Sequence, residues 1–434
     1  MKKITEKHPM ESYREVHPVP VLGLTGVELD ACYQSQVDPL DYYFEVHPSD
    51  SNGQICPVCG TTSFTKEGVS KPRIVHDLLI SGRPVRIRAK VPRYKCKGCG
   101  YRFNHQYEAF LPDKQLTVRL NETLQYEVFS NSLKQLEKRY YVNISTLMEI
   151  LNDAGRAWDN ARSVTAPFHL GIDRTMIKEQ PCYILTDVDS CKIIEITEDD
   201  SVLALDSALS RIKDPERVHS VITDMDADCD DILHSHFPNA KLVVDRIHFM
   251  KTLSNDFSSV YQKLLDQLEI ANQNLSDKKQ RGKIMKDLKK ARIHDYLFRF
   301  SDDANQKLPV DLEEADDLCR KFPELDTLHL CMNKLKKIYI ATNCSNALEK
   351  LERCLVFIKQ SALLNEMSEM EVIVKKVIQS KEKIGNYFLP DQRINNHACL
   401  SLEAQIQKIT RNGGSRKFDS IRYKLLFANR EHKE

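Results

Sequence analysis

Two short cysteine motifs constrain the fold of this chain more than any other feature of its sequence. Each has the form Cys-x-x-Cys-Gly: CPVCG begins at Cys56 and CKGCG begins at Cys96. A tetrahedral metal ion takes two thiolates from each of two tight turns, and the glycine after each pair permits the backbone turn that directs both sulfurs to one point. We therefore expect Cys56, Cys59, Cys96 and Cys99 to bind a structural Zn²⁺. Four cysteines leave no open position at the ion for a substrate.

The segment between the two cysteine pairs is expected to form a hairpin. Its sequence, RIVHDLLISGRPVRIRAKVPRYK, predicts a strand, a turn at Ser81-Gly82 and a second strand. Together with the cysteines this hairpin would be a zinc ribbon. We assign the ribbon to residues 51–105, after an N-terminal segment over residues 1–50.

The expected ribbon is strongly basic, although the whole chain is nearly neutral. From Lys66 to His105, eleven Lys and Arg residues stand against two acids, which is a net charge of +9 in a chain whose total is +1. A concentrated positive surface favours a polyanion such as double-stranded DNA as partner; the alternative is a solvated face without a ligand. The residues expected to contact phosphates are Arg83, Arg86, Arg88, Arg93 and Lys95.

Residues 116–162 follow, with apolar positions at helical spacing. Within them, SLKQLEKRYYVNISTLMEIL has the pattern of a helix, a short turn and a second helix that is capped by Asn143 or Ser145. A helix-turn-helix places such a second helix in the major groove of DNA, where Ser145 and Thr146 would contact bases. A plain helical hairpin without DNA contacts is the alternative.

From Phe168 the pattern changes to short strands. FHLGIDRT, CYILTDVD and KIIEIT are β-rich runs; after a helical piece come the strand VHSVITDMD, another helix and the strand AKLVVDRIH. The expected order is βββαβαβ, a mixed sheet with helices on its faces. Asp173 then lies on the first strand and Asp224 at the end of the fourth, and neighbouring strands would bring both carboxylates to one place. Two hard cations, Mg²⁺ or Mn²⁺, about 3.5–4 Å apart need such oxygens for phosphodiester cleavage.

The last of these strands ends at Asp245, three residues before His248. Two interpretations of this pair stay open. In the first, Asp245 caps the helix that follows, and His248 lies in the first turn of that helix. In the second, both side chains border a catalytic pocket.

These segments together resemble the bacterial insertion-sequence transposases of the ISL-three type, a branch of the DDE transposases with a ribonuclease H-like catalytic core. The resemblance extends over nearly the whole chain. It is densest in VITDMDADCDDILHSHFPNAKLVVDRIHF, where TDM, FPNA and DRIH have the order and spacing of the family. The resemblance implies that Asp173 and Asp224 are the first two catalytic acids. It also implies that Asp245 and His248 form the family's DxxH signature at the border of the pocket.

The third acid of that family has no match at its expected position. The resemblance places a Glu shortly after an Asn pair and six residues before an Ile on the final helix, but counting back from Ile406 gives Leu400. A leucine cannot bind a cation. Glu403 lies one helical turn onward, rotated by about 60° at 3.6 residues per turn. Either Glu403 completes the triad after a small shift in register, or the chain is a decayed or repurposed copy that binds DNA without cutting it.

Residues 251–390 have the pattern of amphipathic helices. The resemblance implies that this all-α insertion interrupts the catalytic core, which would then comprise residues 166–250 and 391–434. The long charged helices are also a candidate surface for a homo-oligomer. The expected architecture is therefore multidomain: zinc ribbon plus helix-turn-helix, then an α/β ribonuclease H-like mixed sheet with a large all-α insertion.

The implied function is that of an insertion-sequence transposase, which binds terminal inverted repeats, cleaves DNA with two Mg²⁺ or Mn²⁺ ions and transfers the strand to target DNA. A metal-dependent nuclease unrelated to transposition is a rival that strand transfer would exclude. No window has the apolar length of a membrane span, and the start lacks the apolar segment of a signal peptide. Most cysteines are single, as in a reducing compartment. We expect a bacterial cytoplasmic protein, nucleoid-associated when bound to DNA, with no membrane partner.

Overall fold

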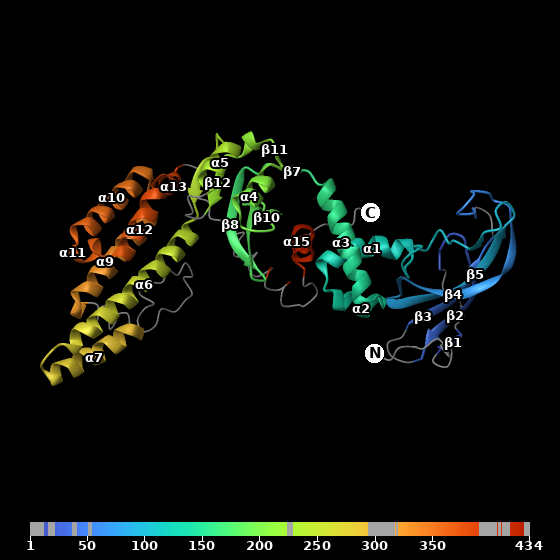
Figure 1. Ribbon diagram of the computed structural model, residues 1–434, viewed down its shortest axis with the longest axis horizontal. Coiled ribbons are helices and arrows are strands. Elements are labelled where there is room, and N and C mark those ends of the chain that lie inside the picture. The colour runs from blue at the N-terminus through green and yellow to red at the C-terminus, as the bar shows by residue number, and fades with distance from the viewer. Residues whose placement is uncertain are drawn as a thin grey trace. The chain divides into compact units, whose positions relative to one another are not determined.

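The computed structural model divides the chain into two compact units (Figure 1). The first comprises Met1–Arg162 and Gln405–Glu434, and the second comprises Ser163–Ala404. The residues that the structure describes are 13–15, 22–36, 41–50, 54–223, 229–293, 317, 320–389, 406, 409 and 417–428.

The first unit contains a sheet around the predicted hairpin. Its strands are β1 (Tyr13–Glu15), β2 (Val27–Ser35), β3 (Tyr42–Pro48), β4 (Phe64–Ile80), β5 (Arg83–Cys96) and β6 (Arg102–Asn104). Their order is β1-β2-β3-β5-β4, with β6 also paired to β5. Strand β3 runs parallel to β5, and the other pairs are antiparallel. The expected N-terminal segment therefore contributes β2 and β3 to the same sheet, which the sequence did not predict.

The turn of the hairpin is the predicted one. Strands β4 and β5 are joined by Ser81 and Gly82 alone, and both residues have positive φ, 51° and 74°. Two successive positive φ angles are the requirement of a type I′ turn, whose twist matches that of the flanking strands. The residue pair thus fixes where the long hairpin closes.

A helical bundle completes the first unit. Its members are α1 (Val118–Ser130), α2 (Leu133–Tyr140), α3 (Ile144–Ala161) and α15 (Phe418–Phe427). A capping box formed by Ser132 and Gln135 starts α2, which ends at Tyr141 in the left-handed conformation. The three residues 141–143 then separate α2 from α3. The predicted succession of helix, short turn and helix is present.

Helix α15 is anchored on α3 by packing and by charge. The ring of Tyr423 lies against Gly155, which has no side chain to obstruct it. Arg422 donates from Nη1 to Asp159 Oδ2 at 2.8 Å. The sequence assigned residues 391–434 to the catalytic core, whereas the described helix of that segment packs against α1 and α3 of the first unit. The boundaries assigned from the sequence otherwise stay a prediction.

The second unit is built on a five-stranded sheet with the expected element order. Its elements are β8 (His169–Ile177), β9 (Gln180–Asp187), β10 (Lys192–Ile196), α4 (Val202–Leu209), β12 (Ser220–Thr223), α5 (Asp230–His236) and β13 (Lys241–Val244). The strand order is β10-β9-β8-β12-β13. Pairs among β10, β9 and β8 are antiparallel, and β8, β12 and β13 are parallel. One short addition is β11 (Ile212–Lys213), which pairs with β7 (Val164–Thr165) in a separate sheet.

Helices cover both faces of this sheet. Leu170, Val221 and Leu242 belong to a core that includes residues of α4 and α5. On the other face, Ile222 and Val243 belong to a core with α6 (Arg246–Gln273) and the helices that follow it. All the described elements from residue 246 to residue 389 are helical, as expected of an all-α insertion.

The insertion returns to the sheet at its last described helix. After α6 come α7 (Lys278–Ile293), α9 (Pro323–Lys336), η4 (Lys337–Ile340), α10 (Cys344–Gln360), α11 (Ala362–Asn365), α12 (Ser368–Gln379) and α13 (Lys381–Asn386). Helix α13 packs on β13, where Asn386 Nδ2 donates to the Leu242 carbonyl at 2.8 Å. The buried Lys383 pairs with Asp230 at the start of α5. The helical segment is thus hydrogen-bonded to the sheet whose last described strand precedes it.

The contact between Gly155 and Tyr423 yields a stability test. A Cβ atom at residue 155 would lie 2.4 Å from the Tyr423 ring, so Gly155→Ala should displace α15 and destabilise the bundle by about 1–3 kcal/mol. Trp158, the single tryptophan of the chain, packs on Phe427 with ring centroids 5.5 Å apart. Its fluorescence during thermal unfolding therefore measures the effect.

Gly282→Ala is the matched control for that test. Gly282 lies in α7, and a Cβ atom there would meet nothing within 4 Å. Alanine in a helix interior is favoured over glycine by roughly 0.5–1 kcal/mol, so this variant should unfold at or above the wild-type temperature. An unchanged unfolding temperature for Gly155→Ala would contradict the packing of α15.

Candidate functional site

The four predicted cysteines come together at the open end of the hairpin. Their sulfurs all lie within 4.8 Å of one another. The distance from Cys56 Sγ to Cys99 Sγ is 3.6 Å, and that from Cys59 Sγ to Cys96 Sγ is 3.5 Å. Sulfurs placed about 2.3 Å from a tetrahedral zinc ion are about 3.8 Å apart, so the cluster fits Zn²⁺.

Local backbone geometry explains why the sulfurs meet. In each motif the glycine N–H donates to the carbonyl of the first cysteine: Gly60 to Cys56 at 2.9 Å, and Gly100 to Cys96 at 3.1 Å. Both glycines have positive φ, 71° and 75°, as predicted for these turns. The backbone N–H of Cys99 donates to Cys96 Sγ and is the largest of several hydrogen bonds that lower the pKa of that thiol, whereas the neighbouring sulfurs raise the pKa of Cys99.

Several bases of the ribbon are neutralised by acids of β2, of β3 and of the residue before β3. Arg86 Nε donates to the buried Asp41 at 2.8 Å, and Arg88 Nη1 donates to Glu45 at 2.8 Å. Lys90 pairs in the same way with Asp30 at 3.1 Å. The net charge of residues 66–105 therefore overstates the free positive charge of the sheet. Arg86 and Arg88 were expected to contact DNA, and both already have anionic partners.

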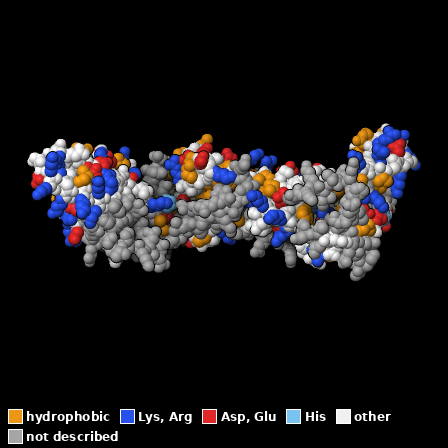
Figure 2. Space-filling model, turned by 90° about the horizontal axis from the view of Figure 1, so that it is seen from below, with side chains coloured by type: hydrophobic (Ala, Val, Ile, Leu, Met, Phe, Trp, Pro, Cys, Tyr) orange, Lys and Arg blue, Asp and Glu red, His pale blue; other side chains and the backbone are white. Residues whose placement is uncertain are grey.

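A smaller basic surface remains near the zinc cluster. We call Arg93, Lys95 and Arg102 the zinc-end basic face. Lys95 pairs in register with Arg102 on β6, and the side chains of all three residues are exposed. The hydrogen bond from Arg102 lowers the pKa of Glu67, and the charges of Arg93 and Lys95 act in the same direction, so all three lie near one carboxylate. Figure 2 shows blue side chains mixed with red and orange ones on the first unit.

The other predicted DNA contacts occupy different positions. Arg83 lies with its guanidinium 5.8 Å from the centroid of the Tyr42 ring. In the first turn of α3, Ser145 is exposed and Thr146 is half-buried. On α2, Lys134 and Lys138 are exposed, one helical turn apart, while the leucines between them and before them are buried. Sequence reasoning did not select these two lysines, although their i, i+4 spacing opposite the apolar face was available.

At the point where the parallel strands β12 and β13 end, both align with the middle of β8, which continues to Ile177. Ile172 of β8, Thr223 of β12 and Val244 of β13 lie side by side in register. The Asp245 N–H donates to the Thr223 carbonyl at 2.8 Å and continues this alignment. Asp173 follows Ile172 on the face that α6 covers, and it is only 4% exposed.

The structure shows the helix cap of the first interpretation, and the catalytic pocket of the second stays a prediction. Asp245 Oδ1 accepts hydrogen bonds from the Ile247 N–H at 2.7 Å and from the His248 N–H at 3.3 Å, so it is the N-cap of α6. The same cap orients the first turn of α6. His248 Nε2 then lies 3.6 Å from Asp173 Oδ1. The predicted pair therefore adjoins the first predicted acid.

Two predicted acids cannot be placed. Asp224, which follows Thr223 in the sequence, lies outside the described residues, and so do Leu400 and Glu403. Their assignment stays a prediction.

The chain matches two protein-family models. One is the ISL3-type DDE transposase model, described as "Transposase", over residues 170–425. The other is described as "zinc-finger of transposase IS204/IS1001/IS1096/IS1165" and matches residues 53–99, which include all four cysteines. No curated protein matches the chain. Among the residues that the structure describes, no helix is both long enough and apolar enough to cross a membrane.

The cysteine cluster yields a test of zinc binding. Cys59→Ser should remove one of four ligands, so the purified chain should lose its bound zinc during dialysis against a chelator while the wild type retains one ion per chain. Elemental analysis after dialysis measures this. Cys191→Ser is the matched control, because Cys191 is an exposed cysteine outside the cluster. Equal zinc content in the wild type and Cys59→Ser would contradict the assignment.

Proposed function

The chain belongs to the ISL3 family of DDE transposases, and from this membership we propose that it binds the terminal inverted repeats of an insertion sequence and cleaves DNA there. We further propose that the freed 3′-hydroxyl is transferred to target DNA. The observation that carries the proposal is the row Ile172, Thr223 and Val244, because each of these aligned residues is followed in the sequence by an aspartate.

The proposed metal ligands are the carboxylates that follow Ile172 and Thr223 in the sequence. Asp173 is held on a central strand, and Asp224 is the residue after Thr223, which pairs with Ile172. Carboxylates are the oxygen donors that Mg²⁺ and Mn²⁺ prefer, so the donor set fits hard divalent ions. When bound, two such ions would activate the attacking oxygen and stabilise the leaving oxygen of a phosphodiester.

His248 and Asp245 are proposed to position Asp173. The Asp245 carboxylate is occupied by two backbone N–H groups of α6, so its role is to fix that helix start. His248 then holds its Nε2 next to the Asp173 carboxylate, from which it can restrict the carboxylate's rotation. This arrangement uses the helix cap to orient a ligand of the proposed metal site.

We propose a ribonuclease H-like core for the second unit. The support is a sheet in the order β10-β9-β8-β12-β13, with an antiparallel meander followed by two parallel strands, and with helices on both faces. In such a fold the acids lie on central strands, and Asp173 lies on β8, the central strand of this sheet.

DNA binding is proposed for two regions of the first unit. The zinc-end basic face would contact phosphates, which carry no sequence information. Helix α3, following α2 and a three-residue turn, would act as the second helix of a helix-turn-helix, with Ser145 and Thr146 toward the bases. Double-stranded DNA is the proposed partner, and the homo-oligomer stays a prediction.

The third ligand distinguishes an active enzyme from an inactive one. We propose Glu403 as that ligand. The second candidate function, a DNA-binding protein without catalysis, is favoured by Leu400, since this residue stands where the family carries an acid and has no oxygen to bind a cation.

Asp173→Asn tests the proposed catalytic function. Replacing one carboxylate of a two-metal site should lower Mg²⁺-dependent cleavage of a duplex carrying the flanking terminal repeat by about 10²–10³-fold or more, the loss expected when one transition-state stabiliser is removed. The affinity for the same duplex should not change. Cleavage is measured by single-turnover gel assay, and affinity by fluorescence anisotropy. Asp187→Asn is the matched control, because Asp187 pairs with Leu170 at the opposite end of β8.

Wild-type cleavage by Asp173→Asn would contradict the proposed site. In the same assay Glu403→Gln should bind DNA without cutting it, and unchanged cleavage would remove Glu403 from the site. A wild-type chain that binds the repeat but does not cut it with Mg²⁺ or Mn²⁺ would establish the inactive alternative. Products joined to a target duplex separate transposition from simple hydrolysis.

A further inference from the structure

The closed end of the β4–β5 hairpin is built into the helical bundle. The Thr117 N–H, at the start of α1, donates to the His76 carbonyl at 3.0 Å, and the His76 N–H donates to the Gln115 carbonyl at 2.9 Å. Leu78 and Leu79 of β4 pack against the core of the bundle. The connection between sheet and helices is therefore made by backbone hydrogen bonds as well as by apolar packing.

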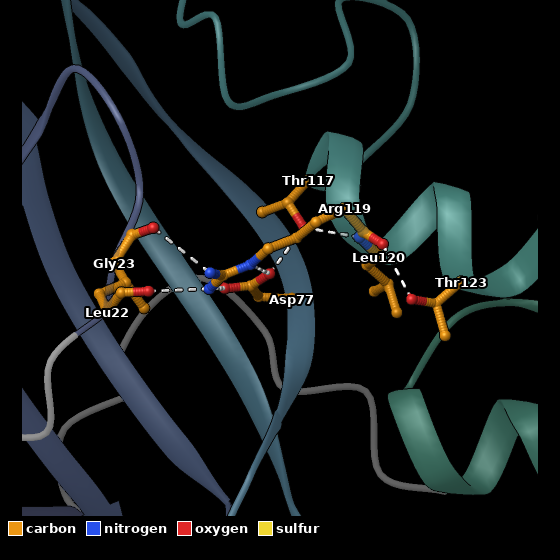
Figure 3. Close-up of polar contacts among 7 residues, drawn as sticks. All are labelled: Leu22, Gly23, Asp77, Thr117, Arg119, Leu120 and Thr123. Carbon is orange, nitrogen blue, oxygen red and sulfur yellow. Dashed lines mark hydrogen bonds and ion pairs between the residues drawn. The ribbon is translucent and has the colours of Figure 1, made fainter. Parts of the chain in front are cut away.

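A buried ion pair strengthens this junction (Figure 3). The Asp77 side chain of β4 is 0% exposed and accepts from Thr117 Oγ1 at 2.7 Å and from Arg119 Nε at 2.8 Å. Arg119 Nη2 also pairs with the Asp77 carboxylate and donates to the Leu22 carbonyl at 2.9 Å. Further along, Arg119 Nη1 faces the Gly23 carbonyl at 3.4 Å. One guanidinium in the first turn of α1 thus links the helix to two separate segments of the sheet domain.

A second contact lies beside the turn before α3. The Arg86 guanidinium of β5 is 5.5 Å from the centroid of the Tyr141 ring, and the same arginine pairs with the buried Asp41. Separating sheet and bundle would break the hydrogen bonds of the Asp77 carboxylate with Thr117 and Arg119 and expose the packed side chains of Leu78 and Leu79 to water, which is unfavourable. A hinge between the two regions is therefore opposed at both contacts.

We propose that the zinc-end basic face and α3 belong to one rigid DNA-binding body, so that the DNA it recognises carries two contact sites at a fixed distance and a fixed rotational phase. This inference rests on the proposed binding of terminal-repeat DNA. It adds that the two regions do not bind independently, and that Asp77 and Arg119 are the positioning residues that fix their separation.

The length of the β4–β5 hairpin determines how far the zinc-end basic face lies from the junction. Lys95 of the zinc-end basic face pairs with Thr65 on β4, and Asp77 follows Thr65 by twelve residues. Twelve residues of extended strand span about 40 Å, less where the register shifts of β4 and β5 shorten it. One turn of B-DNA is roughly 34–36 Å. The hairpin therefore holds the zinc-end basic face at a distance from the Asp77 junction that is comparable to one helical turn of the duplex.

Insertions in the DNA test this directly. The probe is the terminal-repeat duplex, with the two protected patches located by hydroxyl-radical footprinting of the full-length, zinc-loaded chain. Inserting either 5 or 10 base pairs between the patches should lower affinity by about ten-fold or more, because a rigid body then reaches only one patch and loses the phosphate contacts of the other. A 10-base-pair insertion that restores wild-type affinity would overturn the proposal, since it preserves phase and requires flexibility in the protein.

Variants of the protein test which residues contact each patch and whether the junction fixes the distance between the two contact sites. The double variant Arg93→Gln, Lys95→Gln should lose one patch, and the insertions should then have no further effect. The double variant Asp77→Asn, Arg119→Met should bind the native duplex more weakly and tolerate the 10-base-pair insertion. Asp159→Asn is the matched control: its half-buried carboxylate pairs with Arg162 and Arg422 inside the bundle, so it should retain the wild-type sensitivity to insertions.

These experiments distinguish failure of the rigid coupling from failure of the proposed terminal-repeat binding on which it rests. If the double variant at the junction does not fold, as judged by zinc content and Trp158 fluorescence, the insertion series with the wild type decides alone. Equal affinity for the terminal repeat and a scrambled duplex would overturn the proposed recognition and this inference with it. Specific binding that tolerates the insertions would overturn the rigid coupling only.

Discussion

The common register of β8, β12 and β13 determines the chemistry available to the second unit. Because the three strands are parallel and in register at Ile172, Thr223 and Val244, the carboxyl ends of β12 and β13 lie beside the middle of β8, which continues to Ile177. A shift of one residue in any pair would turn the following side chain to the opposite face. The apolar residues on both faces prevent such a shift, since they are buried against helices on either side. The core of the sheet thus keeps Asp173 on the face where His248 lies.

Much of this arrangement follows from sequence because it depends on local patterns. The two cysteine motifs predicted the zinc cluster, and Ser81-Gly82 predicted the turn of the hairpin. The alternation of strands and helices predicted the order of elements in the second unit, in which β8 and β12 are neighbours. Each of these depends on residues close together in the chain or on periodicity. The role of Asp245 as a cap was likewise visible as a strand-end acid before a helix.

The rest was not predictable because it depends on contacts between distant segments. The acids that neutralise Arg86 and Arg88 are Asp41, just before β3, and Glu45 of β3, and a count of charge within the ribbon omits both. Helix α15 packs on α3 through Gly155 and Tyr423, residues whose complementarity no local pattern reveals. The same holds for the pair of Asp77 and Arg119 that joins the sheet to the bundle. In each case, residues that the sequence alone would place in solvent contact a distant segment of the chain.

The central claim is that the Asp173 carboxylate binds divalent ions beside the carboxyl ends of β12 and β13. Anomalous diffraction from crystals of the full chain soaked in Mn²⁺ tests it most directly. The account predicts two manganese peaks about 3.5–4 Å apart, with an Asp173 oxygen as ligand to at least one, and their loss in Asp173→Asn. Manganese bound elsewhere with nothing beside Asp173, or unchanged peaks in the variant, would contradict it.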